Sequence, residues 1–229
     1  MGFTAAIRCP VGCLSALLVI GLALLLPGCS SQKIKADTQR GSPTIQVLAI
    51  NLQQQDLRVA GMAFITPSSV TGQEEDKQTL ALAFTGVMRK IRPDLNIVAL
   101  PETLSAVNRK GLTSEYRQMF EDYRLTGIFE RETLRKVAGV TGMRYLAQLK
   151  LGAFRQESKN RFGFLGLRVI ETKTSTIRLF LQIWDSKDGS VAWEGSQEST
   201  VSHESLAEEY VSMRSIIEES ARELVAQLP

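Results

Sequence analysis

The chain has one histidine, His203, and the chemistry open to it depends on partner residues. A serine-histidine-aspartate triad needs a histidine between a nucleophile and a carboxylate, and a two-histidine metal site needs a second imidazole. His203 stands in a polar stretch just before a predicted C-terminal helix. We interpret it as a surface residue near a helix start, and we predict no catalytic residue and no metal site around it.

Pairs of carboxylates could serve as the two acids of a glycoside hydrolase if they faced one cleft. The candidates are Glu74-Glu75-Asp76, Glu208-Glu209 and Glu218-Glu219. All three groups fall at predicted helix starts or on solvent-facing positions, where carboxylates favour the helix dipole and keep a surface soluble. We therefore predict that the protein is not an enzyme, and a hydrolase is the least favoured alternative.

No segment of the sequence has the pattern of a nucleotide-binding loop. The phosphate-binding motif Gly-x-x-x-x-Gly-Lys-Ser/Thr does not occur. Gly163-Phe164-Leu165-Gly166 lacks the strand-to-helix setting that a dinucleotide site requires. We therefore predict no cofactor.

Two groups of aromatic residues could form contact surfaces. Trp184 and Trp193 flank a predicted hairpin turn, where an exposed pair could bind carbohydrate or protein, although packing across the strands is the favoured interpretation. The segment Arg161–Leu167 contains two phenylalanines and two leucines in a predicted loop or strand start. It could be an exposed contact surface or the ordinary edge of a core, and the sequence leaves both open.

The N-terminal residues have the pattern of an export signal. Arg8 is followed by an apolar run, Val11–Leu26, that contains only Ser15 as a polar side chain and stops at Pro27-Gly28. A permanent membrane-spanning helix needs roughly 20 apolar residues, so it is the less favoured interpretation. The run ends in Leu26-Pro27-Gly28-Cys29, which resembles the lipobox of bacterial lipoproteins. The resemblance implies a signal peptide cleaved before Cys29 and lipid attachment, palmitate included, at Cys29.

This N-terminus predicts a tethered protein. Several acyl chains give stable membrane anchoring, whereas one chain is marginal. Ser30 follows the cysteine where an aspartate would favour the inner membrane, so in a Gram-negative cell we expect an outer-membrane lipoprotein whose domain faces the periplasm. The residues up to Pro43 are small and polar, as in a flexible linker. We therefore predict a signal peptide (1–28), a lipidated cysteine with its linker (29–43) and a single α/β domain (44–229).

Composition limits the partners of the mature chain. Removing residues 1–28 takes away one basic residue, Arg8, and no acidic one, so the formal charge falls from +3 to about +2. Such a mixed surface predicts no nucleic-acid partner, which would need clustered Lys and Arg. Cys9 and Cys13 leave with the signal, so the only remaining thiol is the one assigned to lipid.

Hydrophobic periodicity predicts alternating strands and helices in the first half of the domain. Strands are expected at 44–50, 58–65 and 96–100. A helix should open with a capping box at Thr71-Gly72-Gln73-Glu74, carry Leu80, Phe84, Val87, Met88 and Ile91 on one stripe, and end before Pro93. Short helices are expected from Pro101 to Gly142, broken by Gly111, Gly127 and Gly139.

The second half predicts an antiparallel meander. Strands are expected at 144–154, 167–172 and 176–184, with the polar stretch 155–161 as a connection between the first two. Asp185-Ser186-Lys187-Asp188-Gly189 is a hairpin turn that leads into a strand over 190–201. A long amphipathic helix should follow, opened by a capping box at Ser205–Glu208 and carrying Leu206, Tyr210, Met213, Ile217, Ala221, Leu224 and Leu228. The predicted fold is α/β, with a mixed sheet, helices packed on its faces, and a C-terminal antiparallel hairpin before the last helix.

The hairpin carries a family resemblance. Its strand ends in Trp184-Asp185, its turn contains Lys187-Asp188-Gly189, and Ala192-Trp193-Glu194-Gly195 follows. This pattern, with the strand entry Gly142–Leu146 and the order of elements, resembles envelope lipoproteins with a curli-secretion-channel (CsgG-like) α/β domain. That group includes ring-forming lipoproteins of polysaccharide export and activators of peptidoglycan synthases. The resemblance implies no enzyme activity and no cofactor, and it transfers no ligand residue.

Together these features predict a membrane-anchored envelope lipoprotein that acts as a non-catalytic assembly, secretion-accessory or scaffold component. Its expected partners are the membrane, through lipid on Cys29, and envelope proteins or further copies of itself in a homo-oligomer. A periplasmic module that binds glycan or lipid is the first alternative. An apolar pocket beside Trp184 or Trp193 would favour that alternative.

Overall fold

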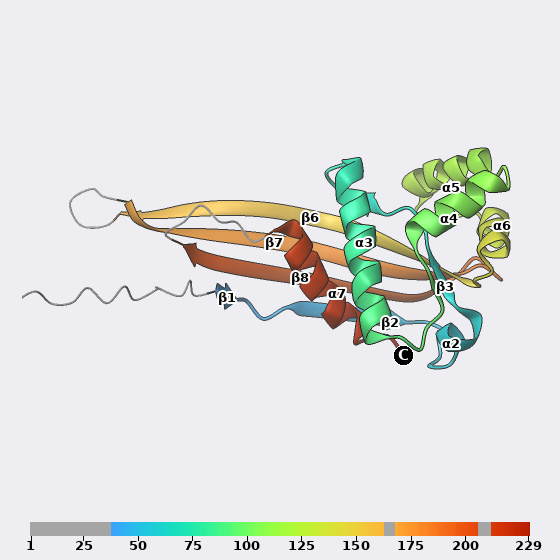
Figure 1. Cartoon of the computed structure of the whole chain (residues 1–229), viewed down its shortest axis with the longest axis horizontal. Coiled ribbons are helices and arrows are strands. Elements are labelled where there is room, and N and C mark those ends of the chain that lie inside the picture. Colours follow the sequence, from blue (N-terminus) through green and yellow to red (C-terminus); the bar gives the residue numbers. More distant parts are fainter. Residues whose placement is uncertain (1–37, 163–167, 206–211) are drawn as a thin grey trace, which may run out of the picture. The chain divides into compact units, whose positions relative to one another are not determined.

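The structure is a computed structural model that describes residues 38–162, 168–205 and 212–229 (Figure 1). Three long strands form an antiparallel meander: β6 (Tyr145–Phe162), β7 (Arg168–Asp185) and β8 (Val191–Ser205). Two short parallel strands, β3 (Met62–Phe64) and β4 (Ser68–Ser69), pair with β6, and a third, β5 (Ile97–Val98), pairs with β3. Beside β8 lie two antiparallel strands: β1 (Thr38–Arg40) and β2 (Thr44–Ala49). The predicted mixed α/β sheet with a C-terminal hairpin and a following helix is confirmed.

One face of the sheet is buried under two helices. α3 (Glu74–Ile91) and α7 (Met213–Val225) pack against each other and cross the strands on this face (Figure 1). Alternate residues of β7, from Ile177 to Ile183, lie in the same buried cluster as residues of both helices. The predicted stripe of α3 is buried at Leu80, Phe84, Val87 and Met88, whereas Ile91 is exposed.

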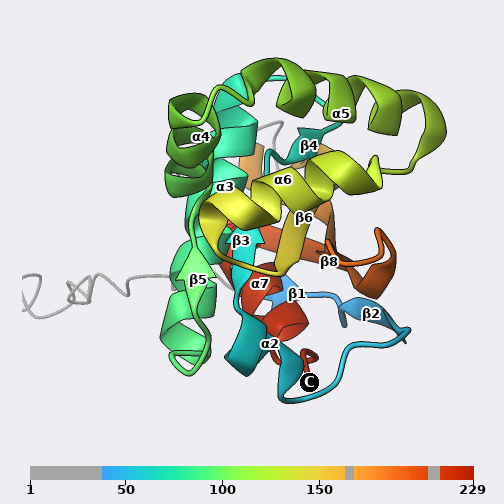
Figure 2. The same cartoon turned by 90° about the vertical axis from the view of Figure 1, so that its right-hand side faces the viewer.

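The opposite face, at the end of the sheet where β3 and β6 begin, is covered by three other helices. These are α4 (Leu100–Arg109), α5 (Thr113–Thr126) and α6 (Arg131–Thr141), and Figure 2 views the sheet from the end at which they lie. A second buried cluster forms there around Phe129 and Trp184, whose ring centroids are 5.1 Å apart. β3 and the start of β6 are thus buried on both faces, as the alternating membership of Met62, Ala63 and Phe64 in the two clusters shows.

The polar stretch 155–161 is strand, so its prediction as a connection is wrong. β6 and β7 pair continuously from Tyr145–Asp185 to Phe162–Arg168, and β8 accompanies β7 as far as Ser205. The pairing shifts register between Leu151 and Ala153, which is a β-bulge. The bulge reverses the faces of β6, so that Phe154 packs on the core while exposed Arg155 and Glu157 face the other way. The alternation of polar and apolar residues changes phase at Gly152, so the sequence pattern does not predict β6 as one continuous strand.

The predicted strand 58–65 is also wrong in its first half. Asp56–Ala60 form a short helix, α2, in which Leu57 is buried and Val59 is exposed. Asp56 favours this turn because its carboxylate accepts the Gln53 N–H at 2.8 Å. Gly61 then turns the chain into β3 with a φ of 65°, and a Cβ there would lie 2.2 Å from the Met143 sulfur.

Several predicted helix boundaries need correction. Residue Gln73 precedes the first turn of α3, so Thr71 is not its capping residue, and the Thr71 hydroxyl instead donates to Asp76. Leu100 begins α4 rather than ending the strand before it, and Gly139 lies inside α6 rather than breaking it. Gly111 and Gly127 do separate α4, α5 and α6, as predicted.

The start of the last helix also differs from its prediction. Ser205 is the last residue of β8, and α7 begins at Met213, after Ser212, whose hydroxyl accepts the Ser215 N–H at 3.2 Å. Leu206 and Tyr210 lie outside the described residues. The later apolar positions Ile217, Ala221, Leu224 and Leu228 are buried, so the predicted amphipathic face is correct from Ile217 onward.

Asp94 connects the C-terminal end of α3 to α2. Its carboxylate accepts hydrogen bonds from Arg92 at 3.1 Å and from Arg58 at 2.7 Å, and Arg92 also donates to the carbonyl oxygen of Pro229. The two guanidinium groups lower the pKa of Asp94 to about 2. The carboxylate therefore stays ionised well below neutral pH and holds α2 to the end of α3, while Arg92 also binds Pro229.

A substitution at Gly195 tests how tightly the core is packed around Trp193. A Cβ at this position would lie 2.3 Å from the ring of Trp193, which is fully buried. We expect Gly195→Ala to destabilise the fold by about 1–3 kcal/mol, because the ring can move only by disturbing its neighbours. Urea denaturation followed by tryptophan fluorescence measures this change.

Gly86→Ala is the matched control for Gly195→Ala. Gly86 lies inside α3 with nothing within 4 Å of an added Cβ, so the same extra methyl should stabilise the helix by up to about 1 kcal/mol. Equal effects at the two positions would contradict the packing described for Trp193.

Candidate functional site

The predicted lipid-attachment residue, Cys29, lies outside the described residues, so its acylation stays a prediction. The segment Gly163–Leu167, which carries most of the candidate aromatic contact surface, and the pair Glu208-Glu209 also lie outside them. Among the described residues, no helix is both long enough and apolar enough to cross a membrane.

His203 does not lie at a helix start, so that part of its interpretation is wrong. It is a residue of β8, opposite Lys173 of β7 and Thr38 of β1. Because β8 continues to Ser205, the backbone of His203 lies between two neighbouring strands, β7 and β1. Among the described residues, no three His, Cys, Asp or Glu side chains come close enough to hold a metal ion.

The described carboxylate pairs do not converge on a cleft. Glu74, Glu75 and Asp76 occupy the first turn of α3, where Glu74 accepts a hydrogen bond from Lys77 at 3.3 Å. Glu218 lies on α7 and pairs with Arg214 at 2.8 Å. These positions are those at which acidic residues interact favourably with a helix dipole or with a cation one turn away.

The pKa shifts of the described carboxyl groups also give no general acid. A general acid needs a carboxyl whose pKa is raised towards neutrality. Where a carboxyl pKa departs clearly from its usual range, it is lowered, because hydrogen bonds from amides and side chains outweigh desolvation. The groups with lowered pKa values are Asp94, Glu115, Glu130 and Asp188.

The two tryptophans are both buried and lie in different clusters. Trp184 packs with Phe129 and Tyr123 under the α4–α6 helices, and Trp193 lies in the core under α3 and α7. They therefore form no common aromatic surface for a sugar ring. No tryptophan lines the described pockets, so the glycan alternative gains no support from them.

Three residues from the segments that carry the family resemblance, Arg144, Asp185 and Lys187, meet at the turn between β7 and β8, where they form a clamp. Arg144 donates from Nε to Asp185 Oδ1 at 2.9 Å and from Nη2 to Oδ2, and the Lys187 N–H donates to the same carboxylate at 2.9 Å. The guanidinium also lies 5.0 Å from the centre of the Tyr145 ring. Hydrogen bonding to the buried Asp185 carboxylate raises the pKa of Arg144. These contacts tie the start of β6 to the β7–β8 turn, which is a structural role.

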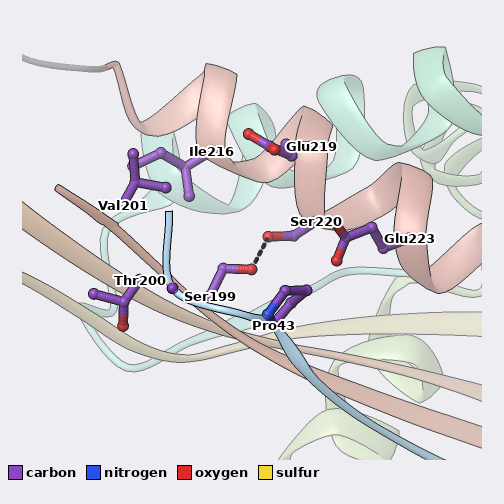
Figure 3. A pocket seen from close by; sticks show the side chains of 9 residues that line it. Pro43, Ser199, Thr200, Val201, Ile216, Glu219, Ser220 and Glu223 are labelled. Atoms are coloured by element: carbon purple, nitrogen blue, oxygen red, sulfur yellow. Dashed lines mark hydrogen bonds between the residues drawn. The ribbon is translucent and has the colours of Figure 1, made fainter. Parts of the chain in front are cut away.

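A small polar hollow lies where the segment between β1 and β2 crosses α7 and β8 (Figure 3). Its volume is about 40 Å³, which is room for little more than a water molecule. Ser199 of β8 and Ser220 of α7 point toward each other, with their hydroxyl oxygens 3.3 Å apart (Figure 3). Gln197 donates to Ser199 at 2.9 Å and also to Glu223. The hollow is a hydrogen-bonded junction between helix and strand, too small for an organic ligand.

The face of the meander that points away from α3 and α7 is polar, and its side chains pair across neighbouring strands. Arg178 of β7 donates to Glu198 of β8 at 2.8 Å, and Thr176 and Thr200 lie within 3.2 Å of each other. Two open hollows of about 290 and 330 Å³ lie on this face, on either side of the Arg178–Glu198 pair that lines both. Such groups can make reversible hydrogen-bonded contacts.

Comparison with known proteins gives similarity in structure only. No protein-family model and no curated protein matches the chain. Among solved structures, the chain is similar to a PelC dodecamer from Paraburkholderia phytofirmans, at 11% identity and a TM-score of 0.47, over 81% of this chain and 97% of that one. It is also similar to lipoprotein GNA1162 from Neisseria meningitidis, at 11% identity and a TM-score of 0.39, over 73% and 98%.

A third similar structure is the LpoB C-terminal domain from Salmonella enterica. The identity is 13% and the TM-score 0.33, over 61% of this chain and 82% of that one. At these values no residue role is transferred from any of the three structures.

The sequence interpretation missed the polar face of the meander. Its signal was present in β7, where Thr174, Thr176, Arg178 and Gln182 alternate with buried residues. The sequence predicts two shorter strands in place of β7. The alternation runs across both of them, so the sequence pattern does not show its full length.

The clamp predicts a large loss of stability when its carboxylate is removed. Asp185→Ala leaves Arg144 without its partner and the Lys187 N–H without its acceptor. Loss of a buried partner costs about 3–5 kcal/mol, and because 40% of the Arg144 side chain is exposed we expect about 2–3 kcal/mol. Urea denaturation measures the free energy of unfolding.

Asp188→Ala serves as the control in the same turn. Asp188 is exposed, and its carboxylate accepts the Ser190 N–H at 2.9 Å. Its removal should cost only about 0.5–1.5 kcal/mol. If Asp185→Ala were no more destabilising than this control, the Arg144 clamp would not stabilise the β7–β8 turn.

Proposed function

We propose that this protein is a lipid-anchored component of a bacterial cell envelope, which acts by binding or assembling with other envelope components and not by catalysis. The observation that carries the proposal is Leu26-Pro27-Gly28-Cys29 at the end of the apolar run Val11–Leu26. Pro27-Gly28 and the polar residues from Ser30 favour cleavage and anchoring over a permanent spanning helix. Lipid on Cys29 would make the membrane the first partner of the chain.

The described domain supports a binding role through its surfaces. The polar face of the meander offers paired charges and hydroxyls around Arg178 and Glu198, without a deep cleft. Asp185, from the hairpin motif that resembles curli-secretion-channel lipoproteins, forms the structural clamp with Arg144. The proposed partners are envelope proteins or further copies of this chain.

Replacement of the lipobox cysteine tests the anchor. Cys29→Ser should abolish incorporation of labelled palmitate and leave the signal segment uncleaved, because the thiol that would carry the lipid is gone. Intact-mass measurement of the processed protein gives the number of acyl chains.

Cys13→Ser is the matched control for Cys29→Ser. Cys13 lies within the proposed signal peptide, so its replacement should leave the mature mass, the palmitate label and the membrane fraction unchanged. Palmitate labelling that persists in Cys29→Ser would refute the lipid attachment site.

Ser30 tests the proposed placement in the outer membrane of a Gram-negative host. In the unmodified chain the protein should sediment with outer-membrane markers in a sucrose gradient. Ser30→Asp should move it to the inner-membrane fractions without changing its lipid content. A protein that stays with the inner membrane in both forms would contradict the outer-membrane proposal and leave the anchor itself intact.

A further inference from the structure

Strand β2 carries apolar side chains that the other described residues leave exposed. The exposed fractions are 43% for Val47, 60% for Leu48 and 57% for Ile50, which follows the strand. Side chains alternate along a strand, so Val47 and Leu48 lie on opposite faces of the sheet. Of the residues in β2, Ile45 alone is partly buried against the core. Pairing with a further strand would bring neighbours to the apolar side chains on both faces.

The backbone of β2 is open along one side. It pairs with β8 from Thr44–Glu198 to Ala49–Trp193, and no described strand pairs with its other side. The Ile50 N–H donates to the Ala192 carbonyl at 3.1 Å, which fixes the alternation of the strand. By that alternation the N–H and C=O groups of Ile45, Val47 and Ala49 point away from β8. These groups can accept a further strand.

Charge distinguishes this edge from the other long edge of the sheet. Beyond Leu151, β6 has no described strand on the side away from β7, but it carries charged residues at 155, 157, 159 and 161. Charged side chains on an edge strand discourage pairing with another chain. Residues 41–55, which contain β2, include no charged residue at all. The β2 edge therefore lacks the protection that the β6 edge has.

We propose that two copies of this chain associate through β2, antiparallel, with Val47 of one copy opposite Val47 of the other. Identical residues face each other across a two-fold axis, so a charge near the centre would face its own copy. An uncharged strand avoids this repulsion. It also has no charged side chain that could pair with an opposite charge on a different protein. The pairing would satisfy the open backbone groups and cover Val47 on one face of the joined sheet and Leu48 on the other.

This inference deepens the proposed assembly role, and it rests on the edge of β2 and not on the anchor. It names a second copy as the partner and a strand as the contact. The experiment must therefore separate self-pairing from lipid attachment. Cross-linking in Cys29→Ser provides this separation, because it removes the lipid and leaves β2 unchanged.

Cysteine scanning in the full chain tests the geometry. Directly opposed residues of antiparallel strands have Cβ atoms about 4.5–5.5 Å apart, near enough for a disulfide after a small adjustment. Val47→Cys, expressed with its own signal and oxidised with copper phenanthroline, should give a dimer on a non-reducing gel. Leu48→Cys should give much less, because Leu48 would face Gln46 of the other copy.

Val59→Cys is the control for chance collisions. Val59 lies on α2 with an exposed fraction of 84%, so its thiol is more accessible than one at position 47. The proposal expects at least a several-fold excess of dimer for Val47→Cys over Val59→Cys and over the unmodified chain. The same excess in a Cys29→Ser background would show that pairing does not need the lipid. Equal dimer at positions 47 and 59, or none at 47, overturns the proposal.

A charge at the centre of the edge gives a test without a disulfide. Val47→Lys should convert the detergent-solubilised full chain from dimer to monomer in sedimentation velocity, because two lysines would face each other. Val59→Lys adds the same charge away from the strand and should leave the dimer in place, with an unchanged circular dichroism spectrum for both. A Val47→Lys protein that stays dimeric overturns the proposal as well.

Discussion

Ile177, Leu179, Leu181 and Ile183 all lie fully or almost fully buried on one face of β7, the middle strand of the meander. Each such side chain contributes roughly 1.5–3 kcal/mol when it leaves water, so this row is a large share of what holds the sheet to α3 and α7. A shift of β7 by one residue would bring Arg178 and Phe180 into that row. The burial of these four side chains therefore fixes the register of both neighbouring strands, and with it the hairpin turn and the polar face.

The two helical layers depend on each other through β3 and the start of β6. Tyr145 and Ala147 face the core under α3 and α7, and Leu146 faces the cluster under α4, α5 and α6. Gln148 is fully buried in the next position of β6. The Arg144–Asp185 clamp lies at this end of the sheet, so the most buried strands and the hairpin turn reinforce one another.

The sequence was sufficient to predict the elements whose pattern is local. The α3 stripe, the hairpin turn at 185–189 and the apolar face of the last helix all depend on side chains a few positions apart. The extent of the long strands could not be predicted in the same way. β6 beyond Phe154 and the facing part of β7 are mostly polar and are held by pairing with each other and with β8, which are contacts distant in sequence. The bulge near Gly152 also breaks the alternation that would have shown one continuous strand.

The candidate site shows the same division. Cys29 could be named from four adjacent residues and an apolar run, because the feature is linear and needs no fold. The open edge of β2 could not be named, because its residues look like any buried strand until the fold leaves one side without a neighbour. The absence of charged residues in β2 can be seen in the sequence. It indicates a pairing edge only because the structure shows that the strand is exposed.

The bulged meander also determines how this domain can change in length. Beyond Arg155 the side chains of β6 that are described are exposed, so this part of the strand contributes little to the core. Side chains alternate with a period of two, so adding or removing one residue there would exchange the faces of everything beyond it. Two residues added to β6 and two to β7 would lengthen the strands and leave each face as it is. The distal meander is thus a segment whose reach can be tuned in steps of roughly 6.6 to 6.8 Å, independently of the helices that pack on its other end.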